Sequence, residues 1–286
     1  MVTSQTHPEK PVHRQTLGIS ILVVLVIGFG ACATVDPGRA DPSTTLDLPP
    51  QTPGRRGLIV VAHGANGAAD EWPLQLERRI RTLDGAERWD IFLVNWPEFS
   101  DRYLTASGAG HEIGTRLGRQ LAGDAYTYEV VHLVGSSLGA HLVEALAAAY
   151  REALPEGRTP ALIHATFLDP FFYRSPLDPW YGIRAFGRHA DFAENYFTRD
   201  EPVLLSNSPL EAAANFDITR AVPPRDDPHF TYIHDYPIFY YIASVGRFRP
   251  GFSLSPLGLG VFDPDGAYNL DYLRQILPAG TTIQVE

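Results

Sequence analysis

The chain has 286 residues, of which 44% are hydrophobic and 20% are charged, and its formal net charge is −10. This composition is typical of a globular protein with a sizeable core. The acidic balance argues against a nucleic-acid-binding protein, because contacts to phosphates require a basic surface. No repeat of fixed period interrupts the chain, so a single enzyme-sized body is expected.

The N-terminal segment has the layout of a secretory signal. An uncharged apolar stretch, Leu17–Ala31, follows two basic residues and ends in small residues. The stretch is short for a membrane span, which needs about 20 residues. Cys32, the single cysteine, follows Phe29-Gly30-Ala31 in a pattern that resembles a bacterial lipobox, where cleavage precedes a lipidated cysteine. We therefore expect residues 1–31 to be a signal peptide and Cys32 to attach the protein to a membrane through lipid.

Two other interpretations of this segment stay open. Ala31-Cys32-Ala33 also fits the cleavage site of an ordinary secreted protein, and an uncleaved apolar helix would itself act as an anchor. All three place the body outside the cytosol. Residues 32–56 are rich in Pro, Gly, Ser, Thr and Asp, so we expect a flexible tether before the body, residues 57–286.

From Gly57 onwards, short apolar runs alternate with segments of helical periodicity. The predicted strands are Leu58–Ala62, Asp90–Asn95, Glu129–Val134 and Ala161–Leu168, followed by a strand-like run, Phe192–Thr198. The predicted helices are Glu71–Leu83, a segment from near Ala106 to Leu121, Leu138–Leu154 and Tyr268–Leu277. This alternation indicates an α/β fold with a mostly parallel sheet and helices on both faces. Polar residues just beyond the carboxyl ends of the strands are then the candidates for chemistry.

A G-x-S-x-G pattern, Gly135–Gly139, stands between the third predicted strand and a predicted helix. This is the context of a nucleophile elbow, in which a sharp turn exposes a serine hydroxyl above the sheet of an α/β-hydrolase. Ser137 is the expected nucleophile, because the adjacent Ser136 is out of frame for both glycines. The backbone N–H of Leu138 would lie at the helix N-terminus, where it would bind the oxyanion of an acyl-transfer intermediate.

A second oxyanion donor is expected from the loop after the first strand. His63-Gly64-Ala65 ends that strand, and a glycine there lets the backbone approach a substrate. The N–H of Ala65 is the predicted donor and that of Asn66 is the alternative. Neither a cofactor nor a metal site is predicted.

The acid and the base should follow the nucleophile in that order. Asp169 comes directly after the fourth strand, from where a carboxylate would orient an imidazole; Asp200, after the next strand-like run, is the alternative. Three histidines follow Asp169 in the chain: His189, His229 and His234. His234 is the predicted base, because it lies where a loop leads into an aromatic segment, and His229 is its rival.

Several of these segments together resemble the pancreatic-lipase-like family of α/β-hydrolases. The similar stretches are Val61–Gly64 (its HG motif), Val94–Trp96 with Tyr103 and Ala106 (its V-D-W stretch), Gly135–His141 (its G-H-S-L-G-A-H elbow) and Leu168–Pro170 (its L-D-P motif). A looser likeness is His234 followed by Tyr240 and Tyr241. The resemblance implies hydrolysis of triacylglycerol- or phospholipid-type esters, and it supports Asp169 over Asp200.

The segment 171–233, between the predicted acid and base, is aromatic and broken by prolines. Such a segment is typical of a lid or an acyl-binding wall, but ordinary packing on the body produces the same composition. The leading hypothesis is a serine carboxylester hydrolase, lipase- or esterase-like, that cleaves a small-molecule or lipid ester through an acyl-enzyme. The alternatives are a lipoprotein that uses this fold only for binding, and an acyltransferase, thioesterase or amidase with the same triad.

Overall fold

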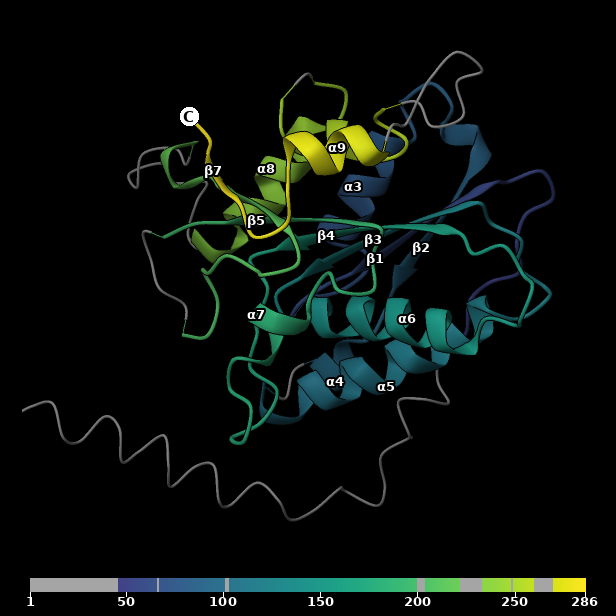
Figure 1. Ribbon diagram of the computed structural model, residues 1–286, viewed down its shortest axis with the longest axis horizontal. Helices are drawn as coiled ribbons and strands as arrows, with labels where there is room; N and C mark the ends of the chain where they lie inside the picture. The colour runs from purple at the N-terminus through teal and green to yellow at the C-terminus, as the bar shows by residue number, and fades with distance from the viewer. Residues whose placement is uncertain are drawn as a thin grey trace, which may run out of the picture. The chain divides into compact units, whose positions relative to one another are not determined.

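The computed structural model (Figure 1) describes residues 46–65, 67–100, 103–199, 204–221, 233–247, 249–259 and 270–286. All of these residues belong to one compact unit, Ala40–Glu286. The predicted signal, Cys32 and most of the predicted tether lie outside the described residues, as do the alternatives Asn66, Asp200 and His229. Within the described ranges, no helix is both long and apolar enough to cross a membrane.

The described chain forms a seven-stranded sheet in the order β2-β1-β3-β4-β5-β6-β7, and every neighbouring pair is parallel. The strands are β1 (Gly57–Ala62), β2 (Trp89–Val94), β3 (Val130–Ser136), β4 (Leu162–Leu168), β5 (Phe192–Phe197), β6 (Ala214–Asp217) and β7 (Thr282–Gln284). The predicted α/β class with a mostly parallel sheet is therefore confirmed.

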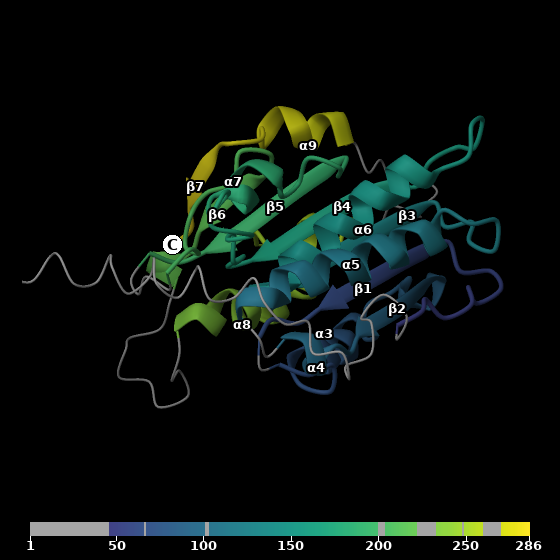
Figure 2. The same cartoon turned by 90° about the horizontal axis from the view of Figure 1, so that it is seen from below.

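Helices cover both faces of the sheet (Figures 1 and 2). On one face lie α4 (Pro97–Ser100), α5 (Tyr103–Leu121), α6 (Gly139–Ala153) and α7 (Tyr181–Ala185). On the other face lie α3 (Trp72–Ile80), α8 (Tyr236–Ser244) and α9 (Leu270–Ile276). One-turn 3₁₀ helices are Ala86–Arg88, Thr219–Ala221, Ile233–Asp235 and Phe252–Leu254.

The central strand β1 is buried along its whole length because each of its faces meets a different helical layer. Leu58 and Val60 belong to the core cluster that includes residues of α5 and α6. Ile59 and Val61 belong to the cluster that includes residues of α3 and α8. Burial on both faces explains why the strand is a continuous apolar run instead of an alternating one.

Helices α5 and α6 pack unusually closely, because glycines of α5 face the backbone of α6. A Cβ atom added at Gly114 would lie 2.1 Å from the Leu142 carbonyl oxygen, and one added at Gly118 would lie 2.3 Å from that of Leu146. No side chain fits at these two positions without separating the helices. The contact holds α5 against α6, which begins at Gly139, two residues after the predicted nucleophile.

The ordered body begins before Gly57, in contrast to the predicted tether boundary. Leu48 is buried in the core, and its backbone is held by Gln120 (3.0 Å) and by the Tyr126 hydroxyl (2.9 Å). Asp47 pairs with Arg116 of α5. The segment 46–56 therefore packs on the body although its composition resembles a linker, because Leu46 and Leu48 supply the apolar contacts that the rest of that stretch lacks.

The segment 171–233 is only partly an insertion above the sheet. It contains β5 and β6, which pair within the sheet, and α7. Phe172 and Phe186 are buried in the core cluster beside α6. These aromatic side chains pack on the body, which is the alternative that composition left open, whereas Phe171 lines a cavity described below.

The glycine contact between α5 and α6 predicts opposite effects for two substitutions in one helix. Gly114→Ala should lower the free energy of unfolding by about 1–3 kcal/mol, because its methyl group overlaps the α6 backbone. Gly108→Ala is the control: a Cβ there meets nothing within 4 Å, so alanine should raise the stability by about 0.5–1 kcal/mol through its helix propensity. Chemical denaturation of both variants measures the difference. Equal effects would contradict the close approach.

Candidate active site

The predicted nucleophile lies in a sharp turn between β3 and α6. Ser137 has a φ of +49°, which is uncommon for a residue with a side chain. Its N–H donates to the Leu168 carbonyl oxygen of β4 (3.1 Å), and its own carbonyl accepts from the N–H of Phe171 (3.1 Å). Leu168 is the last residue of β4 and Phe171 follows it shortly after. Their hydrogen bonds to Ser137 therefore hold the strained turn in place.

Glycines on three sides make this turn possible. A Cβ at Gly135 would lie 2.8 Å from the Gly139 carbonyl oxygen, and one at Gly139 would lie 2.3 Å from that of Ala62 in β1. A Cβ at Gly64 would lie 2.8 Å from the Cβ of Ser137. The two glycines of G-x-S-x-G thus let the strand, the helix and the neighbouring loop approach one another, as the pattern demands.

The two residues predicted to supply oxyanion donors, Ala65 and Leu138, both lie near Ser137. Leu138 directly precedes α6, so its N–H lies at the positive end of the helix dipole. Ala65 follows Gly64 in the loop that contacts Ser137, and both Ala65 and Leu138 line the same cavity as Ser137. The structure therefore brings the two predicted donors to one place.

His63 fixes the direction of the peptide group that carries the Ala65 N–H. Its Nε2 accepts from the backbone N–H of Trp96 (3.3 Å), so its Nδ1 carries the proton and donates to the Gly64 carbonyl oxygen (2.8 Å). In a trans peptide the C=O and the following N–H point in opposite directions. With the Gly64 oxygen held by His63, the Ala65 N–H points away from the imidazole.

Asp169 and His234 form a close hydrogen-bonded pair although 65 positions separate them. The Nδ1 of His234 lies 2.6 Å from Oδ2 of Asp169, and the carboxylate is fully buried. The other oxygen, Oδ1, accepts from the Asn207 N–H (3.0 Å), and the Ser206 hydroxyl also bonds to this carboxylate. An acceptor at Nδ1 places the proton there, so Nε2 carries the lone pair that a general base uses.

This pairing raises the pKa of His234 above its ordinary value. Burial by itself lowers the pKa, because it disfavours the charged imidazolium. The hydrogen bond and the negative charge of Asp169, together with the charge of Asp235, outweigh burial and stabilise the protonated form. Such a shift towards stronger basicity suits an imidazole that removes a proton from a hydroxyl.

Ser137 and His234 line a common cavity of about 590 Å³. Its apolar wall consists of Trp72, Leu138, Leu168, Phe171, Ile238 and Phe239, and its polar part includes Glu71, Gln75 and Asp235. The volume lies within the usual range of small-molecule sites, which are mostly apolar with a few placed polar groups. The cavity is bounded by α3 on one side and by the start of α8 on the other.

Other histidines are placed elsewhere. His189 pairs with Glu144 at the far side of α6 (2.6 Å), and His141 is buried between the rings of Tyr181 and Phe186. Neither lines the cavity. The rival base His229 and the alternative acid Asp200 lie outside the described residues, so only Asp169 and His234 are seen as a pair.

The sequence did not indicate the loop that supports Asp169 or the acidic part of the cavity. Asn207 and Ser206 bond to the carboxylate from a turn in which Leu205 and Asn207 both have positive φ. An asparagine between two serines, with a proline shortly after, is a signal for such a turn, but not for its partner. Asp235, which also lines the cavity, is adjacent to His234 in the chain, but no sequence pattern marks it as part of a site.

Comparisons with known proteins leave the family open. No protein-family model matches the chain, and no curated protein sequence matches it.

The paired Asp169 and His234 predict a specific titration. The imidazole pKa of His234, measured by heteronuclear NMR, should lie above the ordinary value of about 6.5. Asp169→Asn should lower the pKa of His234, since burial is then opposed by the charge of Asp235 without that of Asp169. An exposed ion pair, Asp178 with Arg184, offers a control. Asp178→Asn removes its carboxylate and should leave the pKa of His234 unchanged. An unchanged pKa in Asp169→Asn would contradict the pairing.

Proposed function

We propose that the protein is a serine carboxylester hydrolase of the α/β-hydrolase fold, with Ser137, Asp169 and His234 as its catalytic triad. One observation carries this proposal. The strained turn at Ser137 and the buried Asp169 follow the carboxyl ends of two neighbouring parallel strands, and Asp169 is hydrogen-bonded to His234. Nucleophile, base and orienting acid are the groups that this chemistry requires.

In the proposed reaction, the Ser137 oxygen attacks the carbonyl carbon of an ester while His234 Nε2 takes the serine proton. The negative charge that develops on the carbonyl oxygen is stabilised by the N–H groups of Ala65 and Leu138. Asp169 keeps the imidazole in the required tautomer and stabilises its charged form. His234 then gives the proton to the leaving alkoxide, and an acyl-enzyme on Ser137 remains.

Water completes the cycle. His234 removes a proton from a water molecule, the resulting hydroxide attacks the acyl carbon, and the same two N–H groups bind the second oxyanion. The proton returns to the Ser137 oxygen as the carboxylic acid leaves. The apolar wall of the cavity supports an acyl ester as the substrate, because Phe171, Ile238 and Phe239 offer contacts to an alkyl chain.

The site of action is a further part of this proposal. A lipid anchor at Cys32 would hold the enzyme at a membrane outside the cytosol, as the lipobox-like pattern predicts. A cleaved secreted form and an anchored form with an uncleaved helix are the alternatives, and mass spectrometry of the N-terminus distinguishes all three.

Ser137→Ala tests the proposed nucleophile. We expect cleavage of short-chain p-nitrophenyl esters to fall at least about 10³-fold, because the neighbouring Ser136, which also lines the cavity, belongs to β3 and not to the turn. Labelling by a fluorophosphonate probe should disappear. Ser253→Ala, which removes a hydroxyl outside the cavity, is the control and should retain both. Thermal unfolding should show that both variants fold. Ester cleavage at the original rate in Ser137→Ala would overturn the proposal, and a protein that never labels would favour a binding role.

Gly64→Ala tests the second oxyanion donor. The new methyl group would lie 2.8 Å from the Cβ of Ser137, so the loop must move and take the Ala65 N–H with it. We expect kcat to fall by about 10²–10³, the loss typical of one oxyanion donor, with a smaller change in KM. A loss confined to KM would show that the loop binds substrate without stabilising the transition state.

A further inference from the structure

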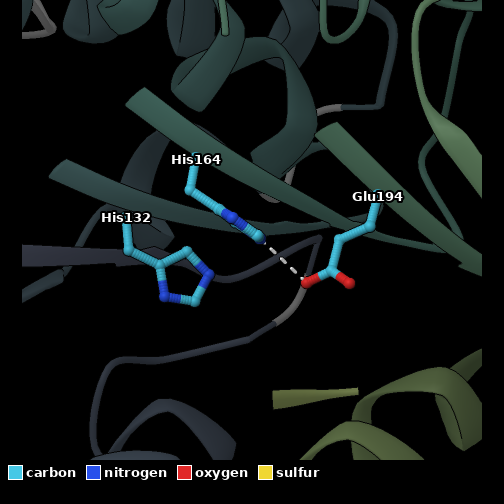
Figure 3. Close-up of side chains that lie close together, drawn as sticks. All are labelled: His132, His164 and Glu194. Carbon is cyan, nitrogen blue, oxygen red and sulfur yellow. Dashed lines mark hydrogen bonds and ion pairs between the residues drawn. The ribbon is translucent and has the colours of Figure 1, made fainter. Parts of the chain in front are cut away.

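A second group of polar side chains is buried under the candidate active site. His132 of β3, His164 of β4 and Glu194 of β5 leave three neighbouring strands on the same side of the sheet (Figure 3), and each is completely buried. His132 is opposite His164 in the strand register, and Thr166 is opposite Glu194. We call His132, His164, Thr166 and Glu194, with the hydroxyls of Tyr196 and Tyr241, the buried polar cluster.

The hydrogen bonds of the cluster converge on Glu194. Its Oε2 accepts from the Tyr196 hydroxyl (2.7 Å), while its Oε1 accepts from the Thr166 hydroxyl (2.8 Å) and from Nε2 of His164 (3.1 Å). A buried carboxylate needs such donors, because it has left its water behind. Glu194 thus gathers side chains from β4 and β5 around one point.

The Thr166 hydroxyl donates its proton to Glu194, and this determines the direction of the hydrogen bond between Thr166 and His132. The Thr166 oxygen must accept from Nε2 of His132 (3.0 Å), so His132 carries its proton on Nε2. Burial, reinforced by the neighbouring His164, holds the pKa of His132 well below its ordinary value, which is consistent with a neutral ring. Its Nδ1 is buried without a partner, and an unpaired acceptor there is more tolerable than an unpaired N–H.

A metal ion is the other occupant that such residues suggest. One ligand atom from each of His132, His164 and Glu194 lies within 4.8 Å of the others, and two histidines with a glutamate are a known zinc set. However, the Thr166 hydroxyl already bridges Glu194 and His132. A cation would have to break both bonds, so the hydrogen-bonded network is the favoured arrangement and metal binding becomes an outcome of the test.

The cluster connects the sheet to the helix that follows the predicted base. The Tyr241 hydroxyl, on α8, lies 3.3 Å from Thr166 Oγ1 and 3.3 Å from Nε2 of His132. The ring of Tyr196 contacts those of Tyr240 and Tyr241, with centroids 5.9 and 5.6 Å apart. His234 lies in the 3₁₀ turn that leads directly into α8, so these contacts set the position of its backbone.

The cluster also reaches the predicted acid. The N–H of Asp169 donates to the backbone oxygen of Tyr196 (2.8 Å), and the phenol of Tyr196 is held by Glu194. Asp169 itself has a φ of +44°, a conformation that depends on outside support. Both members of the Asp169–His234 pair are therefore attached to the same buried group.

We propose that the buried polar cluster is a strut that fixes α8 on the sheet, and that Glu194 and Tyr241 are positioning residues that set His234 against Asp169 and Ser137. This inference rests on the proposed function for its kinetic consequence. It requires no contact between the strut and a substrate, and none of the cluster residues lines the cavity. Small displacements of a catalytic base lower the turnover rate more than they weaken substrate binding.

Two tyrosines on the same helix offer a matched test. Tyr241→Phe removes only the hydroxyl that joins α8 to the cluster, whereas Tyr240→Phe removes a hydroxyl that bonds to the Pro250 carbonyl oxygen (2.9 Å) outside it. With rates expressed per site titrated by a fluorophosphonate, we expect kcat of Tyr241→Phe to fall about tenfold with KM changed less than about twofold. Tyr240→Phe should keep both values within about twofold. Glu194→Gln, which removes the charge but keeps the shape, should lose at least as much turnover as Tyr241→Phe.

The imidazole titration of His234 is a second readout, independent of ester cleavage. A displaced α8 weakens the bond to Asp169, so the raised pKa of His234 should move down in Tyr241→Phe and stay in place in Tyr240→Phe. Asp235 and Glu71 also face this region and remain unchanged in both variants. If the protein cleaves no ester at all, the proposed function fails while this titration still decides the strut.

Three outcomes would overturn the strut. The first is equal kcat values for Tyr241→Phe and Tyr240→Phe, and the second is an unshifted His234 pKa in Tyr241→Phe. The third is about one equivalent of zinc or another divalent metal per chain in the purified protein, measured by mass spectrometry and lost in Glu194→Gln, which would assign the cluster to a metal site instead.

Discussion

The close approach of β1, β3 and α6 around Ser137 is the constraint on which the rest of the site depends. Three backbones meet where Gly64, Gly135 and Gly139 leave no room for a Cβ. This packing pushes Ser137 into a positive φ and, through the same contacts, brings the loop with Ala65 beside it. The positions of Ser137 and of the Ala65 loop are therefore consequences of one steric arrangement.

The parallel sheet supplies the second half of the site. Because β3 and β4 are neighbours in register, Ser137 and Asp169 both emerge at the same edge of the sheet, one residue beyond their strands. Asp169 is held there by β5 and by the turn at Asn207. His234 has no strand to hold it, so its position depends on how α8 packs on the other face.

The polar side chains of the buried polar cluster contribute to this packing of α8 on the sheet. A sheet face lined only by aliphatic residues would hold α8 by nondirectional contacts. Thr166 and His132 add directional contacts to the Tyr241 hydroxyl of α8, since hydrogen bonds specify a register that hydrophobic burial alone does not. The fixed position of the helix is thus linked to the geometry of the Asp169–His234 pair.

The strong local patterns predicted their elements well. β1, β3, β4, α3 and α6 lie within two or three residues of their predicted bounds, because continuous apolar runs and helical spacing are local signals. β6 and β7 were not predicted, since Ala214–Asp217 and Thr282–Gln284 are short and carry few apolar residues. Their pairing comes from neighbours distant in the chain. The packing of residues 46–56 was missed for the same reason.

The sequence by itself determined the parallel α/β class and marked Ser137, Asp169 and His234 as candidates, because strand-to-helix turns and strand ends carry signals within a few residues. Only the tertiary structure decided that Asp169 meets His234 at 2.6 Å and that Ser137 and His234 line one cavity. It also decided that His132, His164 and Glu194 share one buried cluster. These contacts join residues on different strands and helices, and no local pattern specifies distances across a fold; sheet register and helix packing do.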